Sequence, residues 1–256
     1  MATLKACSAL VTGANRGLGL EMVKQLLEAH CSKIFAACRD PDGTNSEALR
    51  QLAKEHPGVI TLVQLDVADP NSIKESAKKV GSLLGKNGLN LIINNAAVLP
   101  QKTMWTTTVE DMIHAFNTNV IGPLFVIREY LPYLQAAAKA SGKPGMSCDK
   151  AAVINIFTDS SSMGIMLSSP EPFPLFPYSI SKAGLNMLTV YTARDLKADE
   201  ILCISLHPGW VNTDMGGDQA PINTRQSVEG ILSVIGSLTE KQHGGFLDYT
   251  GETVPW

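Results

Sequence analysis

A tyrosine and a lysine stand four residues apart, at Tyr178 and Lys182, where a helical segment begins. Positions i and i+4 share one face of a helix, so the phenol and the ammonium group can reach one pocket. An isolated tyrosine has a pKa of about 10, too high for easy proton exchange at neutral pH. A neighbouring cation favours the phenolate and lowers that pKa. The pair predicts a general acid or base, although the spacing alone is also frequent in helices by chance.

A glycine-rich turn lies between a short apolar run and a helical pattern. It reads Thr12-Gly13-Ala14-Asn15-Arg16-Gly17-Leu18-Gly19. Glycine allows a tight turn and a close approach to a pyrophosphate, and the helix that follows offers free N–H groups to the anion. A turn without a ligand is the alternative, but the flanking strand and helix favour a dinucleotide site. Its candidate ligands are Gly13, Asn15, Arg16, Gly17, Leu18 and Gly19.

The end of the second expected strand distinguishes between nicotinamide cofactors. An acidic residue about 20 positions after the glycines would bind the ribose 2′-hydroxyl and repel a 2′-phosphate. This chain has Arg39 there, and Arg16 lies within the turn itself. Two guanidinium groups can make charge-assisted, bidentate contacts with one phosphate, which favours NADP(H) over NAD(H). The alternative is that both are solvated loop charges, and an inward-facing Asp40 would oppose the phosphate.

Strand-like and helix-like segments alternate along the chain, which predicts an α/β fold with a parallel sheet covered on both faces. We expect strands at residues 6–12, 33–38, 59–65, 89–94, 151–157, 201–206 and 246–249. We expect helices at residues 18–29, 46–55, 71–84, 108–140, 178–198 and 224–238, the fourth interrupted near Gly122-Pro123. Asp69 is the expected N-cap of the third, and Thr108 to Asp111 resembles a capping box that opens the fourth. Residues 141–149 and 158–177 are expected to be loops. No repeat or linker divides the chain, so 1–256 is expected to form one domain.

Composition excludes several classes of protein. The chain has 256 residues, 18% of them charged, and a net charge of −3, which argues against disorder and against nucleic-acid binding. No apolar stretch is long enough for a membrane helix, and Met1–Leu10 lacks the apolar segment of a signal peptide. The five cysteines show no C-x-x-C spacing and the histidines no metal-binding pattern. We expect a cytoplasmic protein with mostly buried thiols and no metal.

Together these motifs resemble the short-chain dehydrogenase/reductase family along nearly the whole chain. The matching segments are Thr12–Gly19, Asp66-Val67, Asn94–Ala97, Asn117–Val120, Tyr178–Lys182 and Pro208-Gly209. The segment from Gly245 to Trp256 resembles the ending of sniffer-type carbonyl reductases and C-factor-like proteins. The resemblance implies a single Rossmann-type, doubly wound domain with a mostly parallel sheet of about seven strands.

The resemblance also implies a role for each matching residue. Tyr178 would pass a proton to a carbonyl oxygen as hydride arrives from the nicotinamide. Lys182 would lower the pKa of Tyr178 and hold the nicotinamide ribose, and Asn119 would anchor a water that links Lys182 to solvent. On the cofactor, Asp66 and Val67 would bind adenine, and Asn94 and Ala96 would line the adenosine ribose. The nicotinamide carboxamide would be held by Pro208, Gly209, Val211 and Thr213. Capping or turn roles are the alternative, most of all for Asn94.

The third catalytic group of the family, a serine after the fifth strand, is altered here. The stretch reads Asn155-Ile156-Phe157-Thr158-Asp159-Ser160-Ser161-Ser162-Met163-Gly164. Alignment on Asn155-Ile156 selects Thr158, and alignment on Gly164 selects Ser161. We prefer Thr158, because strand position fixes the geometry of the pocket. Its hydroxyl can still donate to an oxyanion, and its extra methyl group takes space.

The expected activity is NADPH-dependent reduction of a ketone, aldehyde or quinone. An apolar mouth is expected from residues 162–177 with Leu99, Met104, Trp105, Trp210 and Met215, although core packing is the alternative for each. Residues 212–220 would be a mobile lid. Other hypotheses are an NADP(H)-binding signalling module with little turnover, or a steroid alcohol dehydrogenase. Family analogy suggests a homodimer through 110–140 and 178–198.

Overall fold

The computed structural model describes residues 6–169 and 174–256. Residues 1–5 lie outside the described part, as do residues 170–173, which belong to the stretch expected at the substrate mouth. One sheet holds the strands β1 (Ser8–Thr12), β2 (Lys33–Cys38), β3 (Ile60–Gln64), β4 (Leu91–Asn94), β5 (Ala152–Ile156), β6 (Leu202–His207) and β7 (Phe246–Asp248). Their order is β3-β2-β1-β4-β5-β6-β7, and every neighbouring pair is parallel. The predicted α/β fold class is confirmed.

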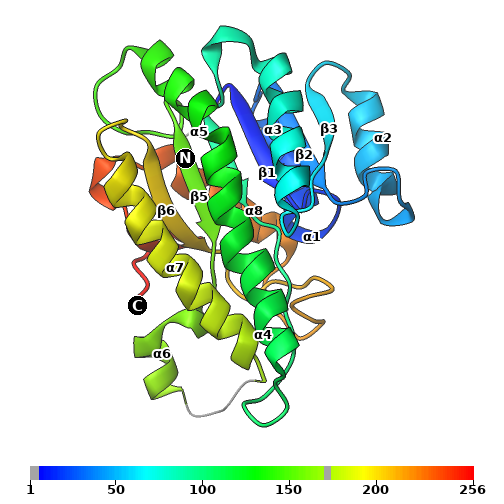
Figure 1. The fold of residues 1–256 in the computed structure, drawn as a ribbon, viewed down its shortest axis with the longest axis vertical. Coiled ribbons are helices and arrows are strands. Elements are labelled where there is room, and N and C mark those ends of the chain that lie inside the picture. Colours follow the sequence, from blue (N-terminus) through cyan, green and yellow to red (C-terminus); the bar gives the residue numbers. More distant parts are fainter. Residues whose placement is uncertain (1–5, 170–173) are drawn as a thin grey trace.

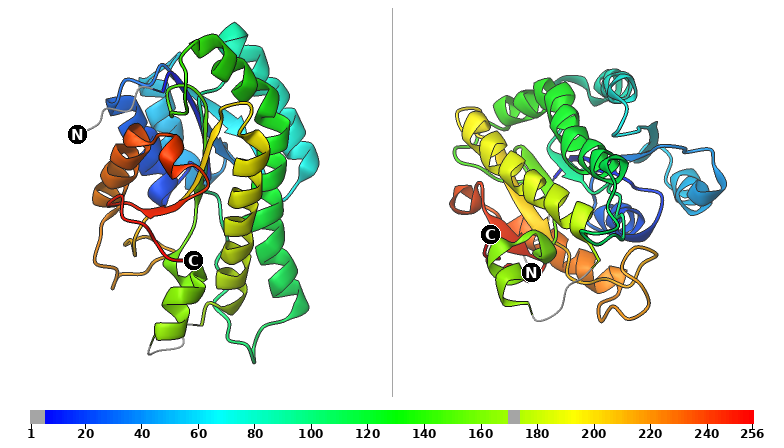
Figure 2. Two further views of the ribbon diagram at one scale, coloured as in Figure 1. Left: turned by 90° about the vertical axis from the view of Figure 1, so that its left-hand side faces the viewer. Right: turned by 60° about the horizontal axis from the view of Figure 1, so that its bottom comes forward.

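Helices cover both faces of this sheet (Figures 1 and 2). Alternate strand residues point to opposite faces, so Val11 joins one hydrophobic core and Leu10 the other. The Val11 core is closed by α1 (Gly17–Glu28), α2 (Glu47–Glu55) and α8 (Thr224–Ser237). The Leu10 core is closed by α3 (Pro70–Leu84), α5 (Gly122–Ser141) and α7 (Phe176–Leu196). Because both faces are covered, β1, β4 and β5 consist entirely of buried residues.

The strand order reverses at β1, which has β2 on one side and β4 on the other. In an open parallel sheet, a ligand binds outside the carboxyl ends of the strands at such a reversal. Here those ends are Thr12 and Asn94. The glycine turn follows the first and the segment 95–98 follows the second, so the topology places both beside the same crevice.

The long helix expected over residues 108–140 is divided in two. It begins with α4 (Val109–Phe116), whose first turn carries the predicted capping box between Thr108 and Asp111. A π-helical turn, Asn117–Ile121, then leads into α5. The interruption therefore precedes Gly122, and Pro123 occupies the first turn of α5, where its missing N–H costs little.

The segment 158–177 is not all loop, which corrects the sequence prediction. A 3₁₀ turn covers Asp159–Ser161, a short helix α6 covers Met163–Ser168, and α7 begins at Phe176. The Ser162 hydroxyl accepts a hydrogen bond from Ile165 N at 3.2 Å and caps α6. Serine favours helix caps as well as loops, so composition alone misread this segment.

The last residues lie against α6. Gly164 N donates a hydrogen bond to the Trp256 carbonyl at 3.2 Å, and the Trp256 ring stacks on Phe246. Membrane-spanning length combined with sufficient apolar character is found in none of the helices within residues 6–169 and 174–256.

Candidate active site

A cavity of about 630 Å³ opens at the carboxyl ends of β1 to β4. It brings together most of the residues expected to bind a cofactor. Those that line it are Gly13, Asn15, Arg16, Gly17, Leu18, Gly19, Arg39, Asp66, Val67, Ala96 and Thr213. They come from four connections between strands and helices and from the loop after β6. The fold therefore gathers groups that are up to 200 residues apart in sequence.

The glycine turn has the backbone that its sequence predicts. Gly13 and Gly17 have φ values of +65° and +52°, which suit glycine, and a Cβ on Gly19 would overlap the Gly13 carbonyl. Asn95 braces the turn, because its Nδ2 donates to the Thr12 carbonyl at 2.9 Å. The Thr12 hydroxyl accepts from Asn95 N at 3.0 Å. A side chain at position 13 or 19 would break this close packing.

Asn94 lies beneath the cavity instead of lining it. It is buried within the sheet, where its Nδ2 donates to Asn155 Oδ1 at 2.8 Å. Asn155 Nδ2 donates in turn to the Thr189 hydroxyl of α7 at 2.9 Å. The structure thus favours the bracing role for Asn94 over a contact with a ribose. Asn95, which lines the cavity, was missed because the sequence motif does not show which of two adjacent asparagines points outward.

The two arginines of the cavity are both exposed, but they differ in what they contact. Arg16 Nη1 pairs with Asp214 Oδ2 at 2.8 Å across the cavity mouth. Such an exposed ion pair contributes only about 0–1 kcal/mol, so Arg16 can exchange it for another anion. Arg39 follows directly after β2 on the adjoining wall. Both guanidinium groups are therefore accessible to an anionic ligand.

The loop of residues 212–220 is anchored at several points. Trp210 Nε1 donates to the Gly216 carbonyl at 2.7 Å, and Gly216 N donates to the Thr213 hydroxyl at 3.0 Å. Asp214 adds the ion pair with Arg16. Of the residues expected at the substrate mouth, Met215 lines the cofactor cavity. Met104, Trp105 and Trp210 are more than half exposed, and Leu99 is half-buried.

The nicotinamide end was expected to include Pro208, Gly209 and Val211. These residues lie between the end of β6 and the loop of residues 212–220 that carries Thr213. Gly209 has a φ of +80° and packs against Ile222 and Tyr249, and Val211 is buried beside Ile222. The Pro208 carbonyl accepts from the Ser227 hydroxyl of α8 at 2.6 Å. These contacts fix the start of the loop that carries Thr213.

Asn119 links the π-helical turn to the rest of the site. It is fully buried, and its Oδ1 accepts from Val98 N while its Nδ2 donates to the Val98 carbonyl, both at 2.9 Å. The same Nδ2 donates to the Ser181 hydroxyl at 2.9 Å. Asn119 therefore ties the segment after β4 to the helix that carries Tyr178 and Lys182.

Tyr178 and Lys182 lie close together, as their spacing predicts, but neither of them lines the cavity. They are 9% and 2% exposed, and Lys182 Nζ lies 5.8 Å from the centre of the Tyr178 ring. Lys182 Nζ donates to the Ile156 carbonyl at 2.7 Å. Burial lowers the pKa of Lys182 to about 7. Burial also raises the pKa of Tyr178 above its ordinary value, and the nearby Asp159 carboxylate raises it further.

The pKa of Tyr178 thus moves opposite to the sequence prediction. Removing a charged group from water disfavours its charged form, whichever sign it has. Burial acts on both members of the pair, so the pKa of the phenol lies above its ordinary value and the pKa of the amine falls to about 7. Spacing predicted the contact correctly, but depth of burial decides the direction of the shift.

The hydroxyl groups of Thr158, Ser160 and Ser161, which follow β5, have different hydrogen-bond partners. Thr158 Oγ1 donates to Asp159 Oδ1 at 3.3 Å and lies 3.2 Å from Ser160 Oγ, which accepts from the Ser179 hydroxyl at 3.1 Å. Thr158 is thereby linked to the residue directly after Tyr178. Ser160 is a further hydroxyl in this group that the sequence analysis did not weigh.

Ser161 points elsewhere. It is buried, donates to the Thr158 carbonyl and accepts from Asn186 Nδ2 at 3.2 Å. Asn186 lies eight residues beyond Tyr178 in α7, or about 12 Å along the helix at about 1.5 Å per residue. Thr158 is thus linked through Ser160 to α7 beside Tyr178, whereas Ser161 is linked to α7 one turn beyond Lys182.

Other residues line the cavity that were not assigned as cofactor ligands from the sequence, although some of them lie in the motifs and the loop named above. These are Cys38, Asp40, Gly43, Thr44, Asn45, Leu65, Ala68, Asn95, Ala97, Val98, His114, Thr118, Asn212, Asp214 and Thr224. Most follow the carboxyl end of a strand, so the topology itself was the signal that could have identified them.

Comparisons with known proteins agree with this geometry. A family model described as "short chain dehydrogenase" matches residues 8–223. The crystal structure of an NADPH-bound carbonyl reductase from chicken fatty liver is 41% identical, with a TM-score of 0.94, covering 99% of this chain and 100% of that one. Carbonyl reductase Sniffer of D. melanogaster is 33% identical, with a TM-score of 0.92, over 98% and 100% of the two chains.

The C-signal protein of Myxococcus xanthus is also similar, 33% identical over 66% of this chain and 93% of its own. The resemblance to sniffer-type carbonyl reductases and C-factor-like proteins is therefore confirmed. From the family match, the sheet topology and the geometry of the site together, we conclude that the chain belongs to the short-chain dehydrogenase family.

Proposed function

We propose that the protein is an NADPH-dependent carbonyl reductase that converts a ketone or aldehyde into an alcohol, or a quinone into a hydroquinone. The observation that carries this proposal is the buried Tyr178–Lys182 pair, tied through Ser181 and Asn119 to the segment after β4. That segment also forms part of the cavity at the topological reversal of the sheet. A proton donor and a dinucleotide site are thus held by one connected set of hydrogen bonds.

The cavity has the chemistry that NADP(H) requires. Its glycine turn lets a pyrophosphate approach the backbone, and Arg39 and Arg16 add two exposed cations for a 2′-phosphate. Asp66 and Val67 would hold the adenine, Ala96 the adenosine ribose, and Thr213 the nicotinamide side. NADPH resolved in the similar chicken fatty liver structure supports this choice. The cofactor supplies the hydride, and the protein must supply the proton.

Tyr178 would give its phenolic proton to the carbonyl oxygen of the substrate, completing the alcohol as the hydride reaches the carbon. Its raised pKa keeps the phenol protonated at neutral pH, which suits the reductive direction. Lys182, with a pKa of about 7, can then return a proton to the phenolate. The Thr158 hydroxyl would donate to the developing oxyanion. Asn119 holds the helix of Tyr178 in register with the cavity.

Two wider expectations belong to this proposal. A homodimer is supported by apolar side chains exposed on neighbouring helices, α4 and α7, namely Val109, Ile113, Ile180, Met187, Val190 and Tyr191. A reducing compartment such as the cytoplasm is supported by the buried thiols of Cys31, Cys38 and Cys203.

The proposal is tested by titrating the purified protein with NADPH and NADH and then adding aromatic ketones, aldehydes, quinones and diketones. We expect preferential binding of NADPH and its oxidation with at least one carbonyl class. Tight NADPH binding without turnover on any compound would instead favour a signalling module that binds NADP(H). Failure to bind either nucleotide would refute both.

A further inference from the structure

The turn between β2 and α2 places two opposite charges side by side at the cavity. Arg39 and Asp40 are both exposed and both line the same wall. A carboxylate at this place can bind a ribose 2′-hydroxyl and repels a 2′-phosphate, whereas a guanidinium attracts the phosphate. Cofactor choice therefore depends on where the Asp40 carboxylate points. The contacts of the turn show what determines that direction.

The Asp40 carboxylate is folded back over Gly43. A Cβ placed on Gly43 would overlap this carboxylate, so the missing side chain leaves the space that it occupies. A backbone hydrogen bond also closes the turn, because Gly43 N donates to the Asp40 carbonyl at 3.4 Å. The Ser46 hydroxyl donates to that carbonyl at 2.6 Å. The carboxylate thus rests on the turn itself.

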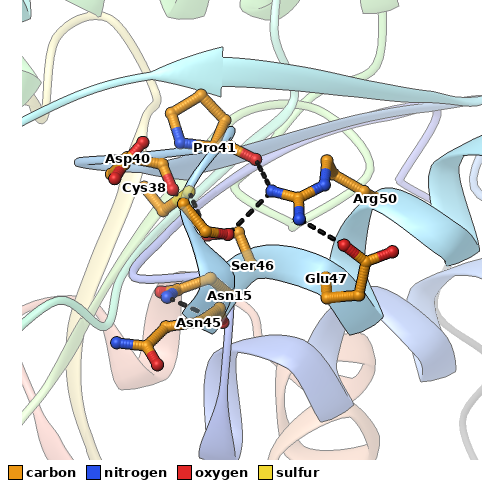
Figure 3. A network of polar contacts seen from close by, with 9 residues as sticks. Asn15, Cys38, Asp40, Pro41, Asn45, Ser46, Glu47 and Arg50 are labelled. Atoms are coloured by element: carbon orange, nitrogen blue, oxygen red, sulfur yellow. Dashed lines mark hydrogen bonds and ion pairs between the residues drawn. The ribbon is translucent and has the colours of Figure 1, made fainter.

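Arg50 holds the turn from α2 (Figure 3). Its Nη1 donates to the carbonyls of Pro41 at 2.9 Å and Gly43 at 2.7 Å, and its Nη2 pairs with Glu47. The side chain is 21% exposed and is not part of the cavity wall. A planar guanidinium group presents its N–H donors in a fixed geometry, so it can hold these two carbonyls in place. A flexible side chain would hold them poorly. The turn that carries Asp40 is therefore fixed by a residue that does not itself line the cavity.

We propose that Arg50 is a positioning residue for cofactor selection. By fixing the carbonyls of Pro41 and Gly43, it keeps the Asp40 carboxylate against Gly43 and leaves the space beside Arg39 free of negative charge. When the turn is released, the carboxylate can swing toward the 2′ position, where it repels a phosphate. This inference rests on the proposed function, because it takes NADP(H) as the cofactor.

The test measures binding of two probes that differ in the 2′-phosphate, adenosine 2′,5′-bisphosphate and 5′-AMP, by calorimetry on the full chain. Wild-type protein is expected to prefer the bisphosphate. In Arg50→Met, which keeps the length of the aliphatic stem, the Kd for the bisphosphate should rise about tenfold, equivalent to about 1.4 kcal/mol. The Kd for 5′-AMP should change less than about twofold, well below that tenfold step. Arg50→Lys should fall between wild type and Arg50→Met.

Two further variants separate positioning from general damage. Glu47→Gln removes the exposed ion pair but leaves both Arg50–carbonyl bonds, so it should bind both probes like wild type. The double variant Arg50→Met with Asp40→Asn should recover tight bisphosphate binding, because a neutral amide does not repel the phosphate. Asp40→Asn should improve bisphosphate binding more in Arg50→Met than in wild-type protein, and that difference is a coupling between residues 40 and 50 that independent sites would not show.

The proposal is overturned if Arg50→Met keeps the wild-type preference, if both probes weaken equally, or if Asp40→Asn does not restore bisphosphate binding. Equal weakening would assign Arg50 a purely structural role, and thermal melting of each variant would show it directly. Wild-type protein without any preference for the bisphosphate would refute the proposed cofactor instead. The two failures are therefore distinguishable.

Discussion

The two ends of the site solve opposite electrostatic problems. At the proposed cofactor end, Arg16, Arg39 and Asp40 are exposed to solvent. At the proposed catalytic end, Asn119, Tyr178 and Lys182 are buried. Burial raises the pKa of Tyr178 and lowers that of Lys182, so it favours the neutral form of each. The comparison shows that one chain can offer solvated charges to a ligand at one end and shift pKa values by removing water at the other.

The largest effect is expected at the buried end, from Tyr178→Phe. This change deletes the proposed proton donor and keeps the ring, so kcat should fall by about 10²–10⁴, the usual contribution of general acid catalysis. The Kd for NADPH should stay close to that of wild type. Steady-state kinetics and fluorescence titration of the same sample measure both. Wild-type turnover in this variant would remove the tyrosine from the mechanism.

Lys182→Met tests whether burial lowers the pKa of Lys182. The pKa of Lys182 falls to about 7 in the folded protein, against an ordinary value of 10.5. Between these values the unfolded chain binds more protons, so the lysine lets stability rise with pH across that window. Relative to Lys182→Met, wild-type protein should therefore become more stable from pH 7 to pH 10. Chemical denaturation at several pH values measures the difference, and a constant difference would show that the amine stays charged.

The kinetics of the same variant test the proton-return step. Reduction by wild-type protein should slow as pH rises through about 7, because the Lys182 ammonium loses its proton there. Lys182→Met should be much slower than wild type and lack this step in its pH profile. A wild-type rate that is flat across this range would argue against proton return by Lys182.

Thr158→Ala and Ser161→Ala test which hydroxyl group after β5 takes part in catalysis. Loss of an oxyanion donor typically costs about 10²–10³ in kcat, and we expect Thr158→Ala near the lower limit because Ser160 lies beside it. Ser161→Ala should change kcat little and lower the melting temperature, since its hydroxyl bonds to Asn186 and the Thr158 carbonyl. The reverse pattern would assign the catalytic hydroxyl to Ser161.

The smallest of these effects is expected at the exposed end, from Arg39→Met. Charge-assisted hydrogen bonds contribute about 1.5–3 kcal/mol, and the exposure of Arg39 to solvent places it at the lower limit, so NADPH binding should weaken about tenfold, with NADH unaffected. The difference between wild type and variant should shrink at high salt, because exposed charges are screened. Titrations at two salt concentrations test this. A loss that is independent of salt would contradict the view that this end uses solvated charge.

Periodicity and local motifs predicted the fold well. Short apolar runs and helical spacing located the sheet and most helices, and the caps at Asp69 and Thr108 were correct. The π-helical turn and α6 were missed because they depend on contacts with distant segments, such as the bond between Gly164 and Trp256. Local propensity contains no information about such partners.

The site was predictable where one motif contains both members of a contact. Spacing alone paired Tyr178 with Lys182, and the residues expected from the glycine turn line the cavity. The site was less predictable where its properties depend on how deeply a side chain is buried or in which direction it points. The pKa of Tyr178 depends on burial, and the orientation of Asp40 depends on Gly43 and Arg50, which no sequence motif relates to a cofactor.

The π-helical turn at Asn117–Ile121 has a consequence for insertions and deletions. A π turn holds one residue more than an α-helical turn, and each residue of an α-helix advances the side chains by about 100°. Deleting one residue here would let α4 and α5 join as one regular helix and rotate Asn119 away from Val98 and Ser181. The segment should therefore accept many substitutions on its outer face but hardly any change in length. Its chain length is constrained in the way that the identity of a catalytic residue is.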